Sequence, residues 1–337
     1  MYFSTFKEID NMSDINILIL SAGTRNKVVS YFKKELTGKG NVIATDCNPL
    51  APAIYVADRH YIVPRIDEPG YLDVIYEICR KEQITAVCSL IDPELTLLSQ
   101  HKQDFAAIGV TVIVSDADTV EICFDKFKMS QFLEANGFHT IKTYDTLASF
   151  QTDYEKNLVG FPVFVKPICG SCSMNIQKLD DMETLINVMH QYDDLMIQEF
   201  MDEKEYGIDV YVDMISHEMV SIFIKEKLLM RAGETDKSVS IKNDELNALM
   251  KEFSDVLPFF GHIDVDVFEK GGRYYISEVN PRFGGGYPHA YECGVNFPKL
   301  IIQNLEGHQN EVSIGNYDED IYMMKYLDVF MKRGKEE

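Results

Sequence analysis

The sequence predicts a mixed fold, in which an α/β unit with a parallel sheet is followed by an α+β unit with antiparallel strands. Three observations support this prediction. Continuous apolar runs such as residues 15–20 alternate with helical segments near the N-terminus, as expected of parallel strands buried on both faces. Polar and apolar side chains alternate with period two in residues 205–213, which is typical of half-solvated strands. Residues 262–282 contain two such segments joined by the turn sequence KGGR, which favours a β-hairpin.

The N-terminal unit is predicted from strands and helices in alternation. Residues 1–13 are mixed and polar, and we expect them to form an irregular leader. The expected strands are 15–20, 42–45, 86–90 and 110–114, and the expected helices end near residue 36, span 71–81 and end near residue 105. Strands and helices that alternate in this way form a parallel sheet with right-handed crossovers.

The rest of the chain contains longer helices and more alternating strands. Gly137 closes the first of these helices, because glycine is a frequent stop signal. The expected helices are 125–136, 180–191, 246–257 and one within 291–306, and the expected strands are 161–166, 195–201, 205–213, 220–225 and 321–326.

Acidic residues follow two strands of the N-terminal unit, where α/β sheets place ligands. Asp46 has the spacing of a ribose ligand in a dinucleotide-binding domain. That fingerprint needs G-x-G-x-x-G, and only Gly23 is present, so NAD binding is disfavoured. Asp92 and Glu94 follow the third strand and fit a ligand site. They fit equally well a helix N-cap at Asp92, with Pro93 as the first helical residue.

The predicted hairpin gathers oxygen atoms on one face. Because side chains alternate along a strand, Asp264 and Asp266 share a face of its first strand with His262. Glu278 and Asn280 share a face of its second strand. Such oxygens repel one another unless a cation lies among them, and Mg2+ takes carboxylate oxygens together with substrate phosphates. The alternative is a solvated polar strand face.

A buried lysine and a loop of small residues favour an anion site. Lys166 ends an apolar strand, where its charge is costly unless it meets an anion. Small side chains in the following loop, residues 169–175, let backbone N–H groups approach phosphate oxygens. Cys169 and Cys172 in this loop form a CxxC, which also fits a redox pair or half of a metal site. Since no second Cys or His pair of suitable spacing follows, we favour a variant of a glycine-rich phosphate loop.

Net charge, apolar content and the number of cysteines exclude several classes of function. The chain has 337 residues and a net charge of −22, so it has no basic excess to meet nucleic acid or an anionic membrane. No apolar run is long enough to span a bilayer, and the N-terminus does not resemble a signal peptide. Its seven cysteines are odd in number and scattered, which fits reduced thiols. We therefore expect a cytoplasmic protein that acts on small molecules.

Four motifs follow one another in a specific order. They are Asp125-Lys126-Phe127-Lys128, Val165-Lys166-Pro167, Gln198-Glu199-Phe200, and Glu278-Val279-Asn280-Pro281-Arg282 with Phe283-Gly284-Gly285-Gly286. In this order and spacing they resemble the ATP-grasp superfamily, and they look most like one ATP-grasp unit of the carbamoyl-phosphate synthase large chain. The resemblance implies a Rossmann-like pre-ATP-grasp domain (14–115), a two-lobed ATP-grasp domain (116–308, with lobes of about 116–197 and 198–308) and a C-terminal segment (309–337).

The resemblance implies an ATP site. Its lysines match residues that touch ATP phosphates, the QEF segment matches the part of the family that runs along adenine, and Glu205 matches a carboxylate that holds the ribose hydroxyls. The implied ATP-binding residues are Lys126, Lys166, Gly170, Ser171, Ser173, Glu199, Phe200, Met201 and Glu205. Cys172 and Asn175 depart from the family, because glycine is frequent at their positions.

The resemblance also implies a metal site and a catalytic arginine. The implied ligands of Mg2+, or of Mn2+ in its place, are Asp266, Glu278 and Asn280, whereas Asp264 is expected to be a neighbour. Arg282 matches a phosphate-facing arginine, whose fork geometry suits phosphoryl oxygens. Arg231 and Lys237 are candidates for further phosphate or substrate contacts, or for solvated loop cations. The three consecutive glycines after Phe283 are expected to provide backbone freedom.

The implied function is that of an ATP- and Mg2+-dependent ligase. A carboxylate or bicarbonate would be activated as an acylphosphate and then attacked by an amine or ammonia. The chain has one ATP-grasp unit where the large chain has two, so we do not expect it to make carbamoyl phosphate alone. One alternative is an ATP-binding subunit of a split synthase that is inactive without a partner chain. A dehydrogenase that uses the N-terminal sheet is another, and both a homo-oligomer and a partner subunit stay open.

Overall fold

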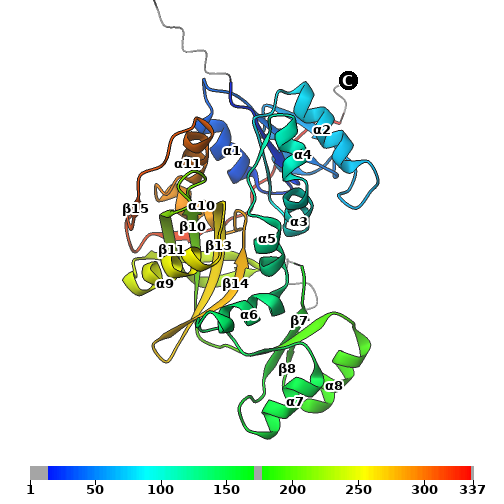
Figure 1. Cartoon of the computed structure of the whole chain (residues 1–337), viewed down its shortest axis with the longest axis vertical. Helices are drawn as coiled ribbons and strands as arrows, with labels where there is room; N and C mark the ends of the chain where they lie inside the picture. Colours follow the sequence, from blue (N-terminus) through cyan, green and yellow to red (C-terminus); the bar gives the residue numbers. More distant parts are fainter. Residues whose placement is uncertain (1–13, 171–176, 335–337) are drawn as a thin grey trace, which may run out of the picture.

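The computed structural model describes residues 14–170 and 177–334, which form three β-sheets with helices packed against them (Figure 1). The N-terminal sheet lies at one end of the molecule, a seven-stranded sheet lies in the middle, and a four-stranded sheet lies at the other end. The predicted fold class is therefore confirmed. The expected leader, residues 1–13, lies outside the described residues. Within the described part of the chain, none of the helices combines the length and the apolar character that crossing a membrane requires.

The N-terminal sheet is parallel, as predicted, with the strand order β3-β2-β1-β4-β5. Its strands are β1 (Ile17–Leu20), β2 (Val42–Asp46), β3 (Arg59–Ile62), β4 (Ala86–Ser89) and β5 (Thr111–Val112). Its helices are α1 (Asn26–Glu35), the 3-10 helix η1 (Pro52–Tyr55), α2 (Tyr71–Lys81), α3 (Asp92–Gln100), α4 (Lys102–Ala107) and α5 (Ala117–Phe124). The sequence did not predict β3, because most of its side chains are exposed and no apolar run marks it.

The four-stranded sheet has the order β6-β9-β7-β8 and is antiparallel throughout. Its strands are β6 (Thr143–Tyr144), β7 (Val163–Pro167), β8 (Gln177–Leu179) and β9 (Leu195–Glu199). Helix α6 (Lys126–Ala135) precedes it, and α7 (Leu147–Glu155) and α8 (Met182–Gln191) lie beside it (Figure 1). Val163 and Val165 of β7 enter the core that this sheet shares with its helices, so Phe164 and Lys166 lie on the opposite face.

The seven-stranded sheet has the order β14-β13-β10-β11-β12-β16, and β15 pairs with β11 in parallel. Its strands are β10 (Lys204–Val212), β11 (Met219–Arg231), β12 (Glu234–Ile241), β13 (Gly261–Lys270), β14 (Arg273–Asn280), β15 (Ser313–Ile314) and β16 (Tyr322–Met324). Helix α9 (Asp244–Val256) packs on one face of this sheet, where Leu246, Met250 and Phe253 join the core. The C-terminal segment thus supplies two strands, of which the sequence predicted only the second.

The helix predicted within residues 291–306 is confirmed as α11 (Phe297–Leu305), and it is preceded by a short helix that the sequence did not predict, α10 (Tyr287–Glu292). Gly294 lies between them with a φ of 92°, a left-handed conformation that ends a helix readily, and Pro298 begins the next one. The domain boundaries that the resemblance implies (14–115, 116–308 and 309–337) stay a proposal.

The predicted hairpin is present as β13 and β14. Gly271 and Gly272 occupy its turn with φ values of 60° and 72°, as a two-residue turn with two left-handed positions requires. Asp266 lies opposite Glu278, and Asp264 lies opposite Asn280. The hairpin therefore brings these four side chains onto one face of the sheet, as predicted.

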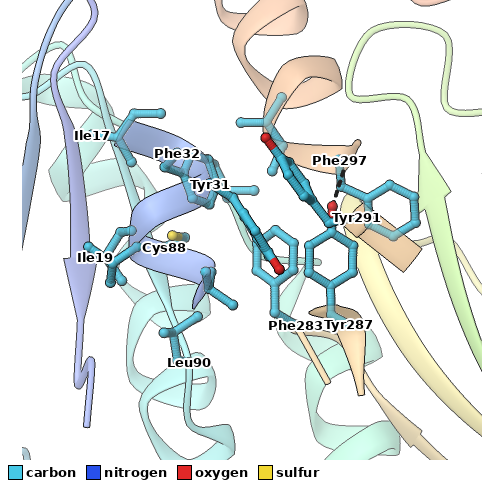
Figure 2. Close-up of a cluster of buried hydrophobic side chains, with 14 of the residues drawn as sticks. Ile17, Ile19, Tyr31, Phe32, Cys88, Leu90, Phe283, Tyr287, Tyr291 and Phe297 are labelled. Atoms are coloured by element: carbon cyan, nitrogen blue, oxygen red, sulfur yellow. Dashed lines mark hydrogen bonds between the residues drawn. The ribbon is translucent and has the colours of Figure 1, made fainter. Parts of the chain in front are cut away.

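An aromatic cluster joins the N-terminal sheet to the loop that follows β14 (Figure 2). Tyr31 of α1 stacks on Tyr291 of α10, with ring centroids 3.6 Å apart, and Phe32 meets Phe283 edge to face at 5.7 Å. The hydroxyl oxygen of Tyr287 accepts a hydrogen bond from the backbone N–H of Phe297 at 2.8 Å. The loop after β14 is thus held against the N-terminal unit by packed rings, and this contact positions the candidate site.

Candidate active site

The acidic face of the hairpin is the centre of the candidate site. Asp266, Glu278 and Asn280 lie on paired strands, and the neighbouring strand β10 places Gly207 opposite Asp266. Among the described residues, no group of three His, Cys, Asp or Glu side chains is arranged to hold a metal ion alone. The oxygens present still fit Mg2+, because this ion usually takes one or two carboxylates and completes its shell with water and substrate phosphates. A metal in this site would depend on such additional ligands.

Two predicted lysines approach this face. The ammonium group of Lys126, the first residue of α6, donates a hydrogen bond to the carbonyl oxygen of Gly170. Burial lowers the pKa of Lys166 below its ordinary value, and Lys126 adds to this effect while Glu278 opposes it. A pocket lined by Lys126, Gly170, Glu278 and Asn280 joins the lysine side of the site to the acidic side. The pocket therefore offers a lysine to a negatively charged group and carboxylate and amide oxygens to a metal ion.

Glu278 is the carboxylate that these cations influence most clearly. Burial alone would raise its pKa, but Lys126, Lys166 and Arg282 outweigh burial and hold the pKa of Glu278 below its ordinary value. Across the hairpin, burial raises the pKa of Asp266, and repulsion from nearby carboxylates adds to this against the attraction of Lys227. Glu278 is therefore the side chain of this pair that is held ionised, ready to bind a cation.

Lys227 belongs to the site, although the sequence did not indicate it. Its ammonium group lies 2.8 Å from Oε1 of Glu205 and 2.5 Å from Oδ1 of Asp266, and only 4% of its side chain is exposed. The two carboxylates raise the pKa of Lys227 against the opposing effect of burial. The predicted strand ended at residue 225, whereas β11 continues to Arg231. If the alternation of the predicted strand had been followed beyond Lys225, it would have placed Lys227 on the same face as Lys225.

The predicted adenine segment, residues 199–201, begins at the last residue of β9. Glu199 accepts a hydrogen bond from the ammonium group of Lys270 at 2.8 Å, so its side chain is engaged with the hairpin. Phe200 packs edge to face on Phe164, with ring centroids 5.0 Å apart, and Met201 is buried. Phe164 shares its face of β7 with Lys166, so the aromatic pair and the lysine border the same space.

Two of the predicted site residues, Arg231 and Lys237, do not lie against the acidic face of the hairpin. Arg231 is exposed and pairs with Asp236 at 3.2 Å, and Lys237 is exposed on β12. Among the described residues, neither of the two makes a hydrogen bond or ion pair with the acidic hairpin face. Ser171 and Ser173 lie outside the described residues, as does Cys172, so the loop prediction for them is untested.

Asp92 does not act as a helix N-cap. It is the first residue of α3, the N-cap position belongs to Ile91, and no side-chain capping bond is present. The carboxylate of Asp92 instead forms a two-point ion pair with Arg282. Asp46 is also engaged, because its two oxygens accept the backbone N–H groups of Gly23 and Asn48 at 2.8 Å each. Both oxygens of Asp46 are therefore engaged in holding turns of the backbone, which argues against the ribose contact that the spacing of Asp46 suggested.

The three glycines after Phe283 provide space, and the expectation of unusual backbone freedom is wrong. None of them has a positive φ. A Cβ on Gly284 would overlap the carboxylate of Asp264, one on Gly285 would lie 2.7 Å from the side chain of Glu234, and one on Gly286 would lie 2.6 Å from that of Lys225. The chain thus passes directly over three charged side chains, which only glycine permits.

Helix α6 offers a test of how Lys126 is positioned. Asp125 caps the helix by accepting the backbone N–H groups of Phe127 and Lys128 at 3.0 and 2.9 Å. We expect Asp125→Ala to lower the free energy of unfolding by about 1 kcal/mol, because two backbone donors lose their partner. Urea denaturation measures the loss. Asp116→Ala is the matched control, since Asp116 occupies the N-cap of α5 without a side-chain capping bond, and a loss as large as that of Asp125→Ala would contradict the assignment.

Family models match both ends of the chain. Residues 17–113 match the PylC-like N-terminal domain, and residues 191–328 match the ATP-grasp domain described as belonging to a biosynthetic pathway with the Ter operon. Formate-dependent phosphoribosylglycinamide formyltransferase of Prochlorococcus marinus is 24% identical over 86% of this chain and 73% of its own length. Alpha-aminoadipate–LysW ligase LysX of Sulfolobus acidocaldarius is 24% identical over 66% of this chain and 75% of its own length.

Solved structures share the fold. The biotin carboxylase domain of Hydrogenobacter thermophilus 2-oxoglutarate carboxylase, in complex with MgADP, ADP and bicarbonate, superposes with a TM-score of 0.72 and 16% identity. That match covers 91% of this chain and 73% of the domain structure. N5-carboxyaminoimidazole synthetase of Staphylococcus aureus gives a TM-score of 0.69 and 15% identity over 88% of this chain and 79% of its own.

Residues 191–328 match an ATP-grasp model, and the prediction of an ATP-grasp ligase is confirmed by this match together with the relatives. The closer likeness to the carbamoyl-phosphate synthase large chain stays a prediction.

Proposed function

We propose that the chain is an ATP- and Mg2+-dependent ligase that activates a small-molecule carboxylate, or bicarbonate, as an acylphosphate for attack by an amine or ammonia. One observation carries the proposal. Glu278 is held ionised by two lysines that arrive from a different sheet and a different helix, and it lies directly opposite Asp266. A structural strand face has no need of cations from two other elements, whereas a site for metal-bound phosphates does.

The residue roles follow from this arrangement. Asp266, Glu278 and Asn280 would hold Mg2+, or Mn2+ in its place, and the ion would neutralise charge on the ATP phosphates. Lys126 and Lys166 would meet phosphate oxygens as movable point charges, together with the loop that begins at Gly170 and includes Ser171 and Ser173. Catalysis of this kind rests on positioning and electrostatic stabilisation, with no side-chain nucleophile.

The remaining contacts fit the nucleoside. Glu199, Phe200 and Met201 would line the adenine, with Phe164 as an additional ring beside them. Glu205 would hold the ribose hydroxyls, with the ammonium group of Lys227 2.8 Å from its Oε1. Arg231 and Lys237 are exposed and are proposed only as substrate contacts.

The relatives favour a ligase that acts by itself over a subunit of a split synthase. The formyltransferase and the LysX ligase match this chain over 73% and 75% of their own lengths, so one ATP-grasp unit accounts for most of each relative. ATP hydrolysis that occurs only after a partner chain is added would favour the alternative. Phosphate release from ATP, screened over carboxylates and amines, would identify the substrates.

Ligand-dependent stability tests the nucleotide site directly. We expect Mg-ATP at a hundred times its Kd to raise the free energy of unfolding by about 2.7 kcal/mol, because a ligand that binds the native state stabilises it. Thermal unfolding of the whole chain with Mg-ATP, and separately with NAD, measures this. Stabilisation by NAD alone would overturn the proposal and favour a dehydrogenase.

A further inference from the structure

An ion pair joins the N-terminal unit to the candidate active site. The carboxylate of Asp92 contacts Arg282 at two points, with Nε 2.8 Å from Oδ1 and Nη2 2.9 Å from Oδ2. The two residues are 190 positions apart, and about nine-tenths of each side chain is buried. The sequence predicted Arg282 as a phosphate-facing residue, but it predicted no partner for it.

The contacts determine how the guanidinium group is oriented. An arginine has five N–H donors in a fixed plane. Asp92 takes the Nε side of this fork, and the carbonyl oxygen of Phe283 accepts from Nη1 at 3.2 Å. Three donors are therefore engaged, and the two that remain belong to Nη1 and Nη2. A planar group held along one edge presents its other edge in a single direction.

Asp92 is itself rigidly placed. It begins α3 directly after β4, and Glu94 two residues later is fully buried, with hydrogen bonds from the hydroxyls of Tyr71 and Ser89. Asp92 is also among the residues that line the pocket, together with Lys126, Gly170, Glu278 and Asn280. An ion pair that served only to join the two units would have no reason to border this pocket, and buried ion pairs contribute little net stability.

We propose that Asp92 is a positioning residue that holds Arg282 with its free N–H groups directed at the terminal phosphate of bound ATP. The inference rests on the proposed function and extends it. The N-terminal unit then contributes to phosphate recognition through a residue that does not itself touch the nucleotide. Through Arg282, Asp92 affects the contact to the γ-phosphate only. The contacts to the α- and β-phosphates and to the nucleoside do not depend on it.

Calorimetric titration of the whole chain with two probes, Mg-ADP and Mg-AMP-PNP, tests this. In Asp92→Asn the neutral amide loosens its hold on Arg282, so we expect affinity for Mg-AMP-PNP to fall about tenfold, as for a lost hydrogen bond to a charged group. Affinity for Mg-ADP should change by less than about twofold, since it lacks the γ-phosphate. Equal losses for both probes, or no loss for Mg-AMP-PNP, would overturn the positioning role.

Further variants separate positioning from stability. Asp92→Glu keeps the charge but moves the guanidinium, so it should lose affinity for Mg-AMP-PNP selectively even if Asp92→Asn proves unable to fold. In the background of Arg282→Lys, which has no fork to hold, Asp92→Asn should cause no further selective loss, and a further loss contradicts the proposal. Asp116→Asn removes an exposed ion pair with Lys102 and should leave both affinities unchanged. Unaltered protein that binds neither probe would refute the proposed function itself.

Discussion

Replacing Glu278 by alanine is expected to lower Mg-ATP turnover at least about a hundredfold, because loss even of an outer-shell partner of a metal costs 10- to 100-fold. Asp266 and Glu278 are the paired carboxylates of the hairpin. The pKa of Asp266 is raised, whereas the pKa of Glu278 is held below its ordinary value. Without Glu278, Lys126 and Lys166 repel each other across a site that has lost its counter-charge, and a metal ion loses its ionised ligand. Steady-state phosphate release at saturating Mg-ATP measures the effect.

The fold should survive this change, since Glu278 is half-buried on a strand and forms no ion pair with another residue that the structure describes. A thermal melt of Glu278→Ala checks that expectation. Glu269→Gln is a matched control on the same hairpin, because the amide oxygen can still accept the hydrogen bond from Tyr206 that is present at 2.6 Å. Turnover in the control should stay within about twofold. Unchanged turnover in Glu278→Ala would remove the metal assignment.

Replacing Gly284 by alanine is expected to cost about 1–3 kcal/mol of stability and to reduce turnover, because the new methyl group has no space. Its Cβ would overlap the carboxylate of Asp264, which lies on the strand that carries Asp266. The strand must shift or the loop must lift, and either movement displaces a proposed metal ligand. Urea denaturation should give a lower midpoint with an unchanged slope, and phosphate release should fall at least about tenfold.

Gly160→Ala is the matched control for this substitution. Gly160 has no atom within 4 Å of the position that a Cβ would occupy, and its φ is not positive. The same chemical change should therefore leave both the urea midpoint and turnover close to those of the unaltered chain. If Gly284→Ala behaves like Gly160→Ala, the loop has room that the structure does not show, and the explanation of the three glycines fails.

The parts of the fold that sequence could predict are those governed by local periodicity. A run such as residues 17–20 is apolar at every position because both faces of the strand are covered, and this pattern marks a parallel strand. Asp266 and Glu278 came onto one face because alternation along a strand is strict and the turn at Gly271 and Gly272 sets the register. The break between Asp266 and Val267 falls beyond the acidic positions, so it did not disturb the prediction.

The parts that could not be predicted depend on contacts between distant segments. Nothing local to Asp92 distinguishes a helix cap from a partner of Arg282, because the deciding contact is 190 residues away. Sequence also cannot distinguish a glycine that needs a left-handed φ from one that needs an absent side chain. Gly271 needs the left-handed φ and Gly284 needs the absence of a side chain, yet both are simply glycine in the sequence.

The aromatic cluster has a consequence for how such proteins can be recombined. Phe283 and Tyr291 find their partner rings on α1, so the surface they cover belongs to both halves of the molecule (Figure 2). A catalytic half transplanted onto a foreign N-terminal sheet would expose these rings to water, and exposed apolar patches of this kind promote association. We therefore expect that neither half can be replaced by the corresponding half of another protein without this exposure. A chimera would have to carry the face of α1 with Tyr31 and Phe32 along with the loop that it covers.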